Sequence, residues 1–266
     1  MTVTVLTDNH TLIDSYFLGE PAVSYYLTDG DKQFLFDTGY SNVYLQNAAK
    51  LGIDLTRVNG IVLSHGHNDH TGGLEYFPPT ERKIPLIAHP DVFEPKRDEG
   101  LSIGSPLTAA EAEERFSLRL SRVPVRLSEH LTFLGEIPRR NDFENREPVG
   151  QRFSGTGWEP DWMKDDSAIV SCGPDGLWII TGCSHAGICN IIAYAKEVCG
   201  EERIAGIIGG FHLMEASCQT EKTVRALTAL APKHLYPCHC TCFHARAAID
   251  RVIPIEEVGS GLRIEC

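Results

Sequence analysis

Short apolar runs alternate with polar loops along the chain, and their spacing predicts a mixture of strands and helices. Residues 23–28 and 33–37 have the alternation typical of two strands joined in a hairpin by a glycine-containing turn. A helix is expected next, because Ser41 can cap its start and Gly52 stands where a C-terminal cap belongs. This part of the chain therefore predicts a hairpin followed by a helix.

Each later apolar run ends directly at a polar segment. Residues 60–64 and 84–88 predict buried strands, and a histidine follows each of them. The second half repeats this order of elements, with a hairpin over 167–172 and 177–181, helices over 188–199 and 220–230, and strands over 204–208 and 234–236. Two such halves predict an α/β fold, a four-layer αββα sandwich in which the sheets pack together, helices lie outside and the loops meet at one edge.

The repeated pattern stops between residues 90 and 164, although 108–116 predicts a helix there. Long irregular segments in compact domains are often lids or binding loops. We therefore expect residues 90–164 to form a lid-like insertion within a single domain of residues 1–266. Trp158 could close over a flat substrate, and the alternative is an aromatic side chain that pins the loop to the body.

The composition limits which class of protein this chain can be and which kinds of partner it can bind. Hydrophobic residues make up 42% and charged residues 23% of the chain, and no run approaches the roughly 18 apolar residues of a membrane-spanning helix. Residues 1–14 lack the basic and apolar regions of a secretory signal, so we expect a cytoplasmic protein with mostly reduced cysteines. The formal net charge of -12 disfavours nucleic acid as a partner. We expect a small-molecule substrate.

Four potential metal ligands occur in the string HGHNDH over 65–70, at the end of a predicted buried strand. Imidazole nitrogens and a carboxylate suit divalent zinc, iron or manganese. The tight turn can direct His65 and His67 to one ion, and Asp69 and His70 to a second. We therefore expect one or two divalent ions per chain, with zinc as the first choice.

Six residues cannot saturate two ions, so further ligands must come from distant loops that also follow predicted strands. His239 and His185 are the main candidates, and His212 fits either a ligand or a catalytic contact to substrate. His89 is a further candidate, although His-Pro at a strand end is also typical of an ordinary turn. Asp37 ends its strand before a glycine turn, where its carboxylate could orient a metal-bound histidine.

Four cysteines also lie beside histidines, namely Cys183, Cys238, Cys240 and Cys242. The C-x-C-x-C spacing differs from the C-x2-C spacing that closes structural zinc sites easily. A structural zinc or an iron–sulfur cluster nevertheless stays an alternative for this group.

The HxHxDH motif, the upstream FDTG and the two-half order of elements resemble the metallo-β-lactamase superfamily over nearly the whole chain. Together with GCSHAGICNII, GGFHL and PCHCT they resemble its branch of 7,8-dihydropterin-6-methyl-4-(β-D-ribofuranosyl)aminobenzene 5'-phosphate synthases. The resemblance implies an enzyme that joins a pterin to a ribosylated aminobenzene phosphate. In much of the superfamily an aspartate after the second hairpin bridges the two ions. Cys183 lies in that loop here, so the bridging ligand and the ion count stay open.

Two reactions fit these expectations. In the synthase reaction, divalent ions would bind the diphosphate leaving group of a pterin diphosphate, and Arg139 and Arg140 could clamp a phosphate. In a hydrolase, a metal-held water oriented by Asp69 would attack a phosphoester, a lactone or an amide. A non-catalytic metal-bearing binding module is a third alternative.

Overall fold

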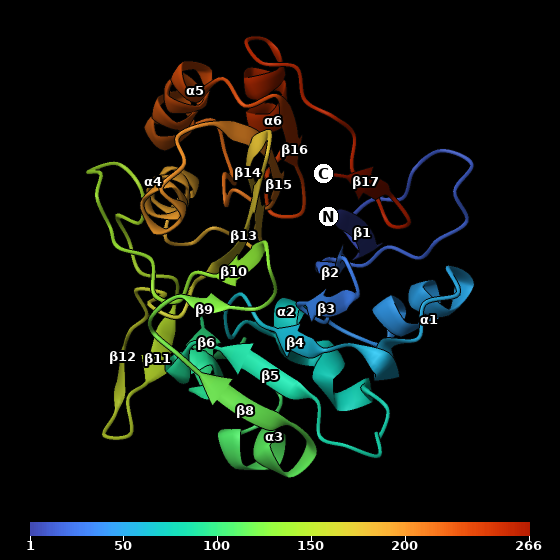
Figure 1. Ribbon diagram of the computed structural model, residues 1–266. Coiled ribbons are helices and arrows are strands. Elements are labelled where there is room, and N and C mark those ends of the chain that lie inside the picture. The colour runs from blue at the N-terminus through green and yellow to red at the C-terminus, as the bar shows by residue number, and fades with distance from the viewer.

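Two large β-sheets face each other in the computed structural model, which describes residues 1–266 (Figure 1). The first sheet has seven strands, in the order β17 (Arg263–Glu265), β1 (Thr2–Thr7), β2 (Ser24–Asp29), β3 (Lys32–Phe36), β4 (Gly60–Val62), β5 (Pro85–Ala88) and β8 (Ser117–Leu120). The second has six, in the order β16 (His234–Pro237), β15 (Ile204–Gly209), β14 (Gly176–Thr181), β13 (Ala168–Gly173), β10 (Leu131–Phe133) and β9 (Val125–Arg126).

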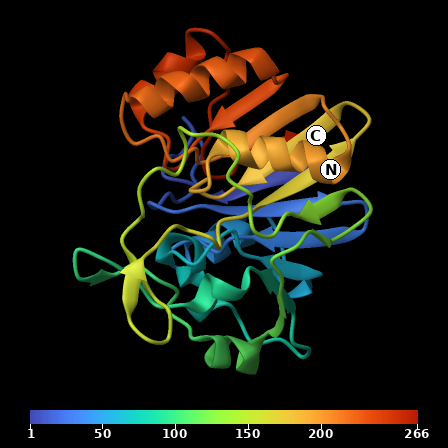
Figure 2. The same cartoon turned by 90° about the vertical axis from the view of Figure 1, so that its left-hand side faces the viewer.

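Helices cover the outer faces of both sheets (Figure 2). Buried side chains of α1 (Val43–Lys50) and α3 (Ala109–Arg115) pack on the first sheet, and those of α4 (Ile188–Cys199), α5 (Cys218–Leu230) and α6 (Phe243–Asp250) pack on the second. Shorter helical turns are α2 (Asn68–Thr71), η1 (Leu55–Arg57), η2 (Gly72–Tyr76) and η3 (Pro90–Phe93). The four predicted layers are therefore confirmed.

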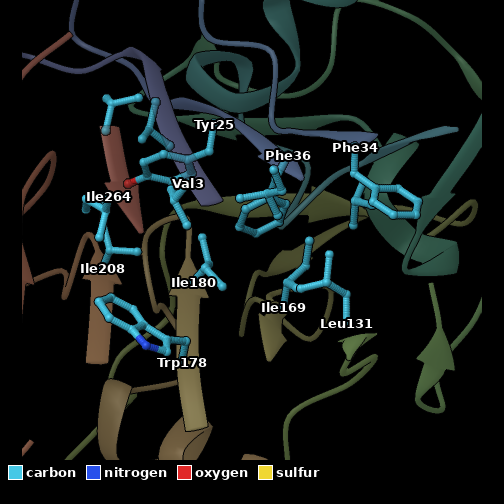
Figure 3. Packing of buried hydrophobic residues seen from close by; sticks show 14 of the residues in the cluster. Val3, Tyr25, Phe34, Phe36, Leu131, Ile169, Trp178, Ile180, Ile208 and Ile264 are labelled. Carbon is cyan, nitrogen blue, oxygen red and sulfur yellow. The ribbon is translucent and has the colours of Figure 1, made fainter. Parts of the chain in front are cut away.

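The central core lies between the two sheets. Figure 3 shows Tyr25 and Phe36 of the first sheet facing Ile169 and Ile180 of the second. Alternate residues of these strands point into this core, as expected for sheets buried on one face by another sheet. Removal of this apolar surface from water is the main force that holds the two halves together.

The predicted repetition of the two halves is also confirmed. In the first half β2 and β3 are antiparallel, and β4 and β5 follow in parallel to β3. In the second half β13 and β14 are antiparallel, and β15 and β16 follow in parallel to β14. The loops after the parallel strands consequently leave each sheet at the same edge.

Both chain ends belong to the first sheet, which the sequence pattern did not predict. Strand β1 pairs with β2 on one side and with β17 on the other, so the termini are adjacent (Figures 1 and 2). The backbone nitrogen of Met1 lies 3.2 Å from the carbonyl oxygen of Cys266. The alternating residues Val3 and Val5 are fully buried, which explains the pattern at the start of the chain.

The boundaries expected for a lid-like insertion over 90–164 are wrong in part. Strand β8 belongs to the first large sheet, and β9 and β10 belong to the second. A separate small sheet has the order β12 (Trp158–Pro160), β11 (Gln151–Phe153), β6 (Lys96–Asp98) and β7 (Leu101–Ser102). The pattern broke down because these strands have only two to four residues each, too few for a clear period.

The predicted helices are confirmed, with small changes at their ends. Helix α1 begins at Val43 rather than at a cap on Ser41, whose hydroxyl donates to Glu20 Oε2 at 2.6 Å. Gly52 follows this helix with a φ of +70°, as expected for a C-terminal cap. None of the helices has the length and apolar character needed to cross a membrane.

Candidate metal centre

Two groups of potential ligands lie where the strands of the two sheets end. The first ligand group consists of His65, His67 and His185, whose ligand atoms are within 4.8 Å of one another. The two residues of the HxH motif follow β4, and His185 follows β14 in the other sheet. The first ligand group therefore joins the two halves of the chain.

The second ligand group consists of Asp69, His70, Cys183 and His239, again with ligand atoms within 4.8 Å of one another. Asp69 and His70 come from α2, Cys183 follows β14 and His239 follows β16. The His65 and His70 rings lie 4.1 Å apart between centroids, so the two groups are neighbours. The six residues predicted as metal ligands are thus brought together, and Cys183 joins them.

A carboxylate fixes the orientation of His70. Asp37 Oδ2 accepts a hydrogen bond from His70 Nδ1 at 2.7 Å. The backbone N–H and the hydroxyl of Ser64 donate to the two oxygens of Asp37, both at 2.7 Å. His70 Nε2 is left to face Cys183 Sγ at 3.1 Å. In such an arrangement, a carboxylate that accepts the other ring N–H sets the tautomer of a metal-binding imidazole.

The N-terminal strand fixes the orientation of His239. Asn9 Oδ1 lies 2.9 Å from His239 Nδ1, and Asp8 Oδ2 accepts the backbone N–H of His239 at 3.1 Å. His239 Nε2 then lies 3.3 Å from Asp69 Oδ2. Asp8 and Asn9 follow β1 directly, so a strand absent from the sequence prediction positions a candidate ligand.

Several imidazole nitrogens at this edge are buried without a hydrogen-bond partner. They are Nε2 of His65 and His67, both nitrogens of His185, and Nδ1 of His212. Buried polar atoms are normally paired, and a bound ion is one of the partners that can satisfy those left unpaired by the protein. Imidazole, carboxylate and thiolate are also the ligands that zinc prefers. The residues present therefore fit one or two divalent ions.

The electrostatics of the site keep most of the imidazoles neutral. Burial lowers the pKa of His67 to about 3 and that of His65 and His185 well below the usual range. Burial acts in the same direction on His70, but the carboxylates of Asp69 and Asp37 outweigh it and raise the pKa of His70 to about 9. Binding of a cation to the second ligand group would therefore release a proton from His70.

A buried ion pair supports the loop that carries the first ligand group. The backbone N–H of Gly66 donates to Asp165 Oδ2 at 2.8 Å, and Lys96 Nζ donates to Asp165 Oδ1 at 3.0 Å. A Cβ atom at Gly66 would lie 2.2 Å from the carbonyl oxygen of Val92, so only glycine fits. Lys96 is on β6. The small third sheet therefore supports the candidate metal centre through the contact of Lys96 with Asp165.

His89 lies outside both ligand groups, which corrects its candidacy as a metal ligand. Its Nδ1 accepts the backbone N–H of Asp91 at 3.1 Å and caps η3. Its Nε2 lies 3.0 Å from Arg122 Nη1. Both ring nitrogens have protein partners, as expected for an ordinary turn after a strand.

The predicted substrate-binding roles of Arg139, Arg140 and Trp158 stay predictions. The Arg139 guanidinium donates to the carbonyl oxygen of Trp162, and the Arg140 guanidinium pairs with Glu197. The Trp158 ring lies against the guanidinium of Arg97, 4.0 Å from its carbon to the ring centroid, in the small sheet. A cavity lies beside His185 and His212, and none of these three residues lines it.

That cavity has a volume of about 530 Å³ and is lined by His185 and His212. Arg146 and Lys222 supply positive charge to its wall, and Phe143 supplies an aromatic face. The predicted substrate contact of His212 is compatible with this position. The two basic residues were missed because neither stands in a recognisable motif.

Sequence reasoning also missed two buried groups near the ligands. Cys183 belongs to the second ligand group, whereas the sequence pattern alone groups it with the other cysteines beside histidines. Asp166 Oδ1 lies 3.9 Å from His65 Nδ1, and burial raises the pKa of its carboxyl to about 7. Nothing in the pattern before β13 distinguishes Asp166 from a surface acid.

The model of the metallo-beta-lactamase superfamily matches residues 18–231, which is more than half of the chain. The chain belongs to this superfamily. A protein of Methanocaldococcus jannaschii named 7,8-dihydropterin-6-methyl-4-(beta-D-ribofuranosyl)-aminobenzene-5'-phosphate synthase is 33% identical over 226 residues, which cover 80% of this chain and 77% of that protein. The resemblance expected from the motifs is therefore confirmed.

Solved structures of the superfamily agree with the fold. Tm1679, described as a metal-dependent hydrolase of the beta-lactamase superfamily, is 31% identical with a TM-score of 0.86, over 100% of this chain and 99% of that chain. A diphosphatase of the PhnP family is 14% identical with a TM-score of 0.54, over 100% of this chain and 97% of that chain. The second likeness concerns the fold alone.

Proposed function

We propose that this protein is a metal-dependent transferase with the activity named for its M. jannaschii relative. The reaction would join a pterin diphosphate to an aminobenzene ribose phosphate. The observation that carries this proposal is the 33% identity over 226 residues, because the ligand groups alone suit several reactions. The first and second ligand groups would hold the ions, with zinc as the first candidate.

Divalent ions bound there would neutralise the charge that develops on a diphosphate leaving group. The amine nitrogen of the aminobenzene would form a bond to the pterin methylene carbon, the bond from that carbon to the diphosphate oxygen would break, and an amine proton would pass to solvent. Asp37 and Asn9 contribute by holding the candidate ligands His70 and His239 in fixed tautomers. Preformed ligands of this kind reduce the reorganisation needed when substrate binds.

The cavity beside the first ligand group supports a phosphorylated aromatic substrate. Arg146 and Lys222 can pair with a phosphate, and Phe143 offers a face on which a ring can pack. His212 lines the same cavity next to His185, with ring centroids 4.2 Å apart, and can donate a hydrogen bond to substrate. Substrate bound there would lie directly against the ligand groups.

The test is an assay of the zinc-loaded protein with a pterin diphosphate and the aminobenzene ribose phosphate. We expect diphosphate release that requires both substrates, and His67→Ala should abolish it. Diphosphate release of equal rate without the aminobenzene compound would contradict the transferase.

A pair of arginine variants tests where the phosphate binds. Arg146→Met removes a charge that lines the cavity, whereas Arg140→Met removes one that pairs with Glu197. We expect the first variant to raise KM for the aminobenzene ribose phosphate about tenfold or more, equivalent to about 1.4 kcal/mol of binding free energy. The second variant should leave KM unchanged, and the opposite result would favour the site predicted from sequence.

A metal-dependent hydrolase is the second candidate, because the likeness to Tm1679 covers the whole chain at a TM-score of 0.86. The same ligand groups suit hydrolysis of a phosphoester or a lactone, with Asp69 orienting the attacking water. A panel of phosphodiesters and lactones assayed without pterin distinguishes the two candidates. Turnover of either class by water alone would favour the hydrolase.

A further inference from the structure

A third group of potential ligands lies next to the two already described. Cys183, His212 and Cys240 have their ligand atoms within 4.8 Å of one another. They follow β14, β15 and β16 in turn, so three neighbouring strands of the second sheet each contribute one residue. Cys183 belongs both to this third ligand group and to the second, whereas Cys240 belongs to the third alone.

The backbone is shaped to admit the Cys240 sulfur. A Cβ atom at Gly210 would lie 2.4 Å from Cys240 Sγ, so a side chain there would occupy the space of the sulfur. The backbone N–H of His212 donates to Cys240 Sγ at 3.3 Å. The Cys240 thiol in turn lies 3.5 Å from the carbonyl oxygen of Cys183. These contacts hold the three candidate ligands in one place.

Hydrogen bonds between the two loops fix the register of His212 and Cys240. The backbone N–H of Phe211 donates to Thr241 Oγ1 at 3.0 Å, and that of Cys242 donates to the carbonyl oxygen of Leu213 at 2.9 Å. His212 has a φ of +47°, a left-handed conformation that is costly for a residue with a side chain. Its buried Nδ1 has no partner in the protein. Strain and an unpaired nitrogen at one residue point to a ligand-binding role.

The neighbouring cysteines are directed elsewhere. Cys238 Sγ lies 3.3 Å from the hydroxyl of Tyr25 inside the central core. Cys242 caps α6, where its sulfur accepts the backbone N–H of Ala245 at 3.4 Å. The alternative that Cys183, Cys238, Cys240 and Cys242 together form one structural zinc or iron–sulfur site is therefore wrong, because the Cys238 and Cys242 sulfurs lie in environments different from that of the other two.

We propose that Cys183, His212 and Cys240 form a third coordination site that binds a soft, thiophilic cation such as Cd²⁺. Two thiolates and one imidazole favour soft ions over the harder ions that suit a carboxylate. Binding would release the two thiol protons to solvent. The shared Cys183 sulfur would bridge this site to the second ligand group. The site does not depend on the transferase reaction proposed above.

The test is a titration of chelator-treated, reduced protein with Cd²⁺ alone. Equilibrium dialysis with elemental analysis gives the number of bound ions, and ultraviolet absorption reports sulfur-to-cadmium charge transfer. The parent should bind one ion more than Cys240→Ser. The absorption of this variant should fall, because only the Cys183 thiolate, which the second ligand group shares, is left to bind an ion. The matched control Cys242→Ser removes a nearby thiol and keeps a helix cap, so it should titrate like the parent.

If circular dichroism shows that Cys240→Ser is not folded, His212→Asn tests the proposal independently. This variant keeps both thiols and should lower the affinity of the third ligand group for Cd²⁺ about tenfold or more. An unchanged ion count and unchanged absorption in folded Cys240→Ser, or an unchanged affinity for the third ion in His212→Asn, would overturn the proposal. Because no substrate is present, failure of the transferase assay leaves this result unaffected.

Discussion

Lys96→Met should destabilise the protein strongly, because Lys96 is a buried cation that pairs with two buried carboxylates. Its Nζ lies 2.5 Å from Asp161 Oδ2 and 3.0 Å from Asp165 Oδ1. All three side chains are 1% exposed. Removal of one partner from such a group leaves uncompensated charge and costs about 3–5 kcal/mol. That loss is a large share of the ~5–15 kcal/mol by which domains are usually stable.

The free energy of unfolding can be measured by urea titration of the metal-free protein in the presence of a chelator. The exposed pair of Lys32 and Asp31 provides the control, and Lys32→Met should leave the urea midpoint unchanged. The triple variant with Lys96→Met, Asp161→Asn and Asp165→Asn should recover much of the loss, because no buried charge is left unpaired.

The same variant connects stability with the candidate metal centre. Asp165 also accepts the backbone N–H of Gly66, so disorder of this carboxylate would loosen the loop between His65 and His67. Lys96→Met should therefore weaken binding of zinc as well as folding. Surface ion pairs contribute up to about 1 kcal/mol. If Lys96→Met lowers the free energy of unfolding by less than this, the two carboxylates are not left as unpaired buried charges and the argument is refuted.

Three further predictions follow from individual contacts. Asp37→Asn should weaken the affinity for zinc about 10- to 100-fold, because the amide orients His70 less well; an unchanged affinity in a competition titration would contradict this. Burial raises the pKa of Asp29, but hydrogen bonds from the facing turn outweigh it and lower this pKa below the usual 3.8. The ionised Asp29 therefore stabilises the fold fully above pH 3.8, and this stabilisation is lost as the pH falls through the folded-state pKa. Asp29→Asn should thus lower the urea midpoint at pH 7 but not at the acid limit, and a difference that persists in acid would exclude this cause. Gly210→Ala should cost about 1–3 kcal/mol through its clash with Cys240 Sγ, and a urea midpoint equal to that of the parent would show that the loop adapts.

The sequence by itself determined the repeated order of elements and the central metal-binding motif. Periodicity is a local property, so the hairpins before Asp37 and Cys183 were readable without tertiary information. The cluster of His65, His67 and His70 within one turn is equally local. The meeting of the loops at one edge followed from the rule that parallel strands end on the same side.

Only the tertiary structure decided which distant residues complete the site. Asn9 reaches His239 because β1 lies in the first sheet and its end faces the loop after β16, a relation between residues 230 positions apart. Cys183 and Cys240 meet because β14, β15 and β16 are neighbouring parallel strands. Lys96 supports Gly66 through Asp165 from a sheet whose strands are too short to predict. Contacts of this kind depend on strand order and side-chain packing, which a local pattern of apolar and polar residues does not encode.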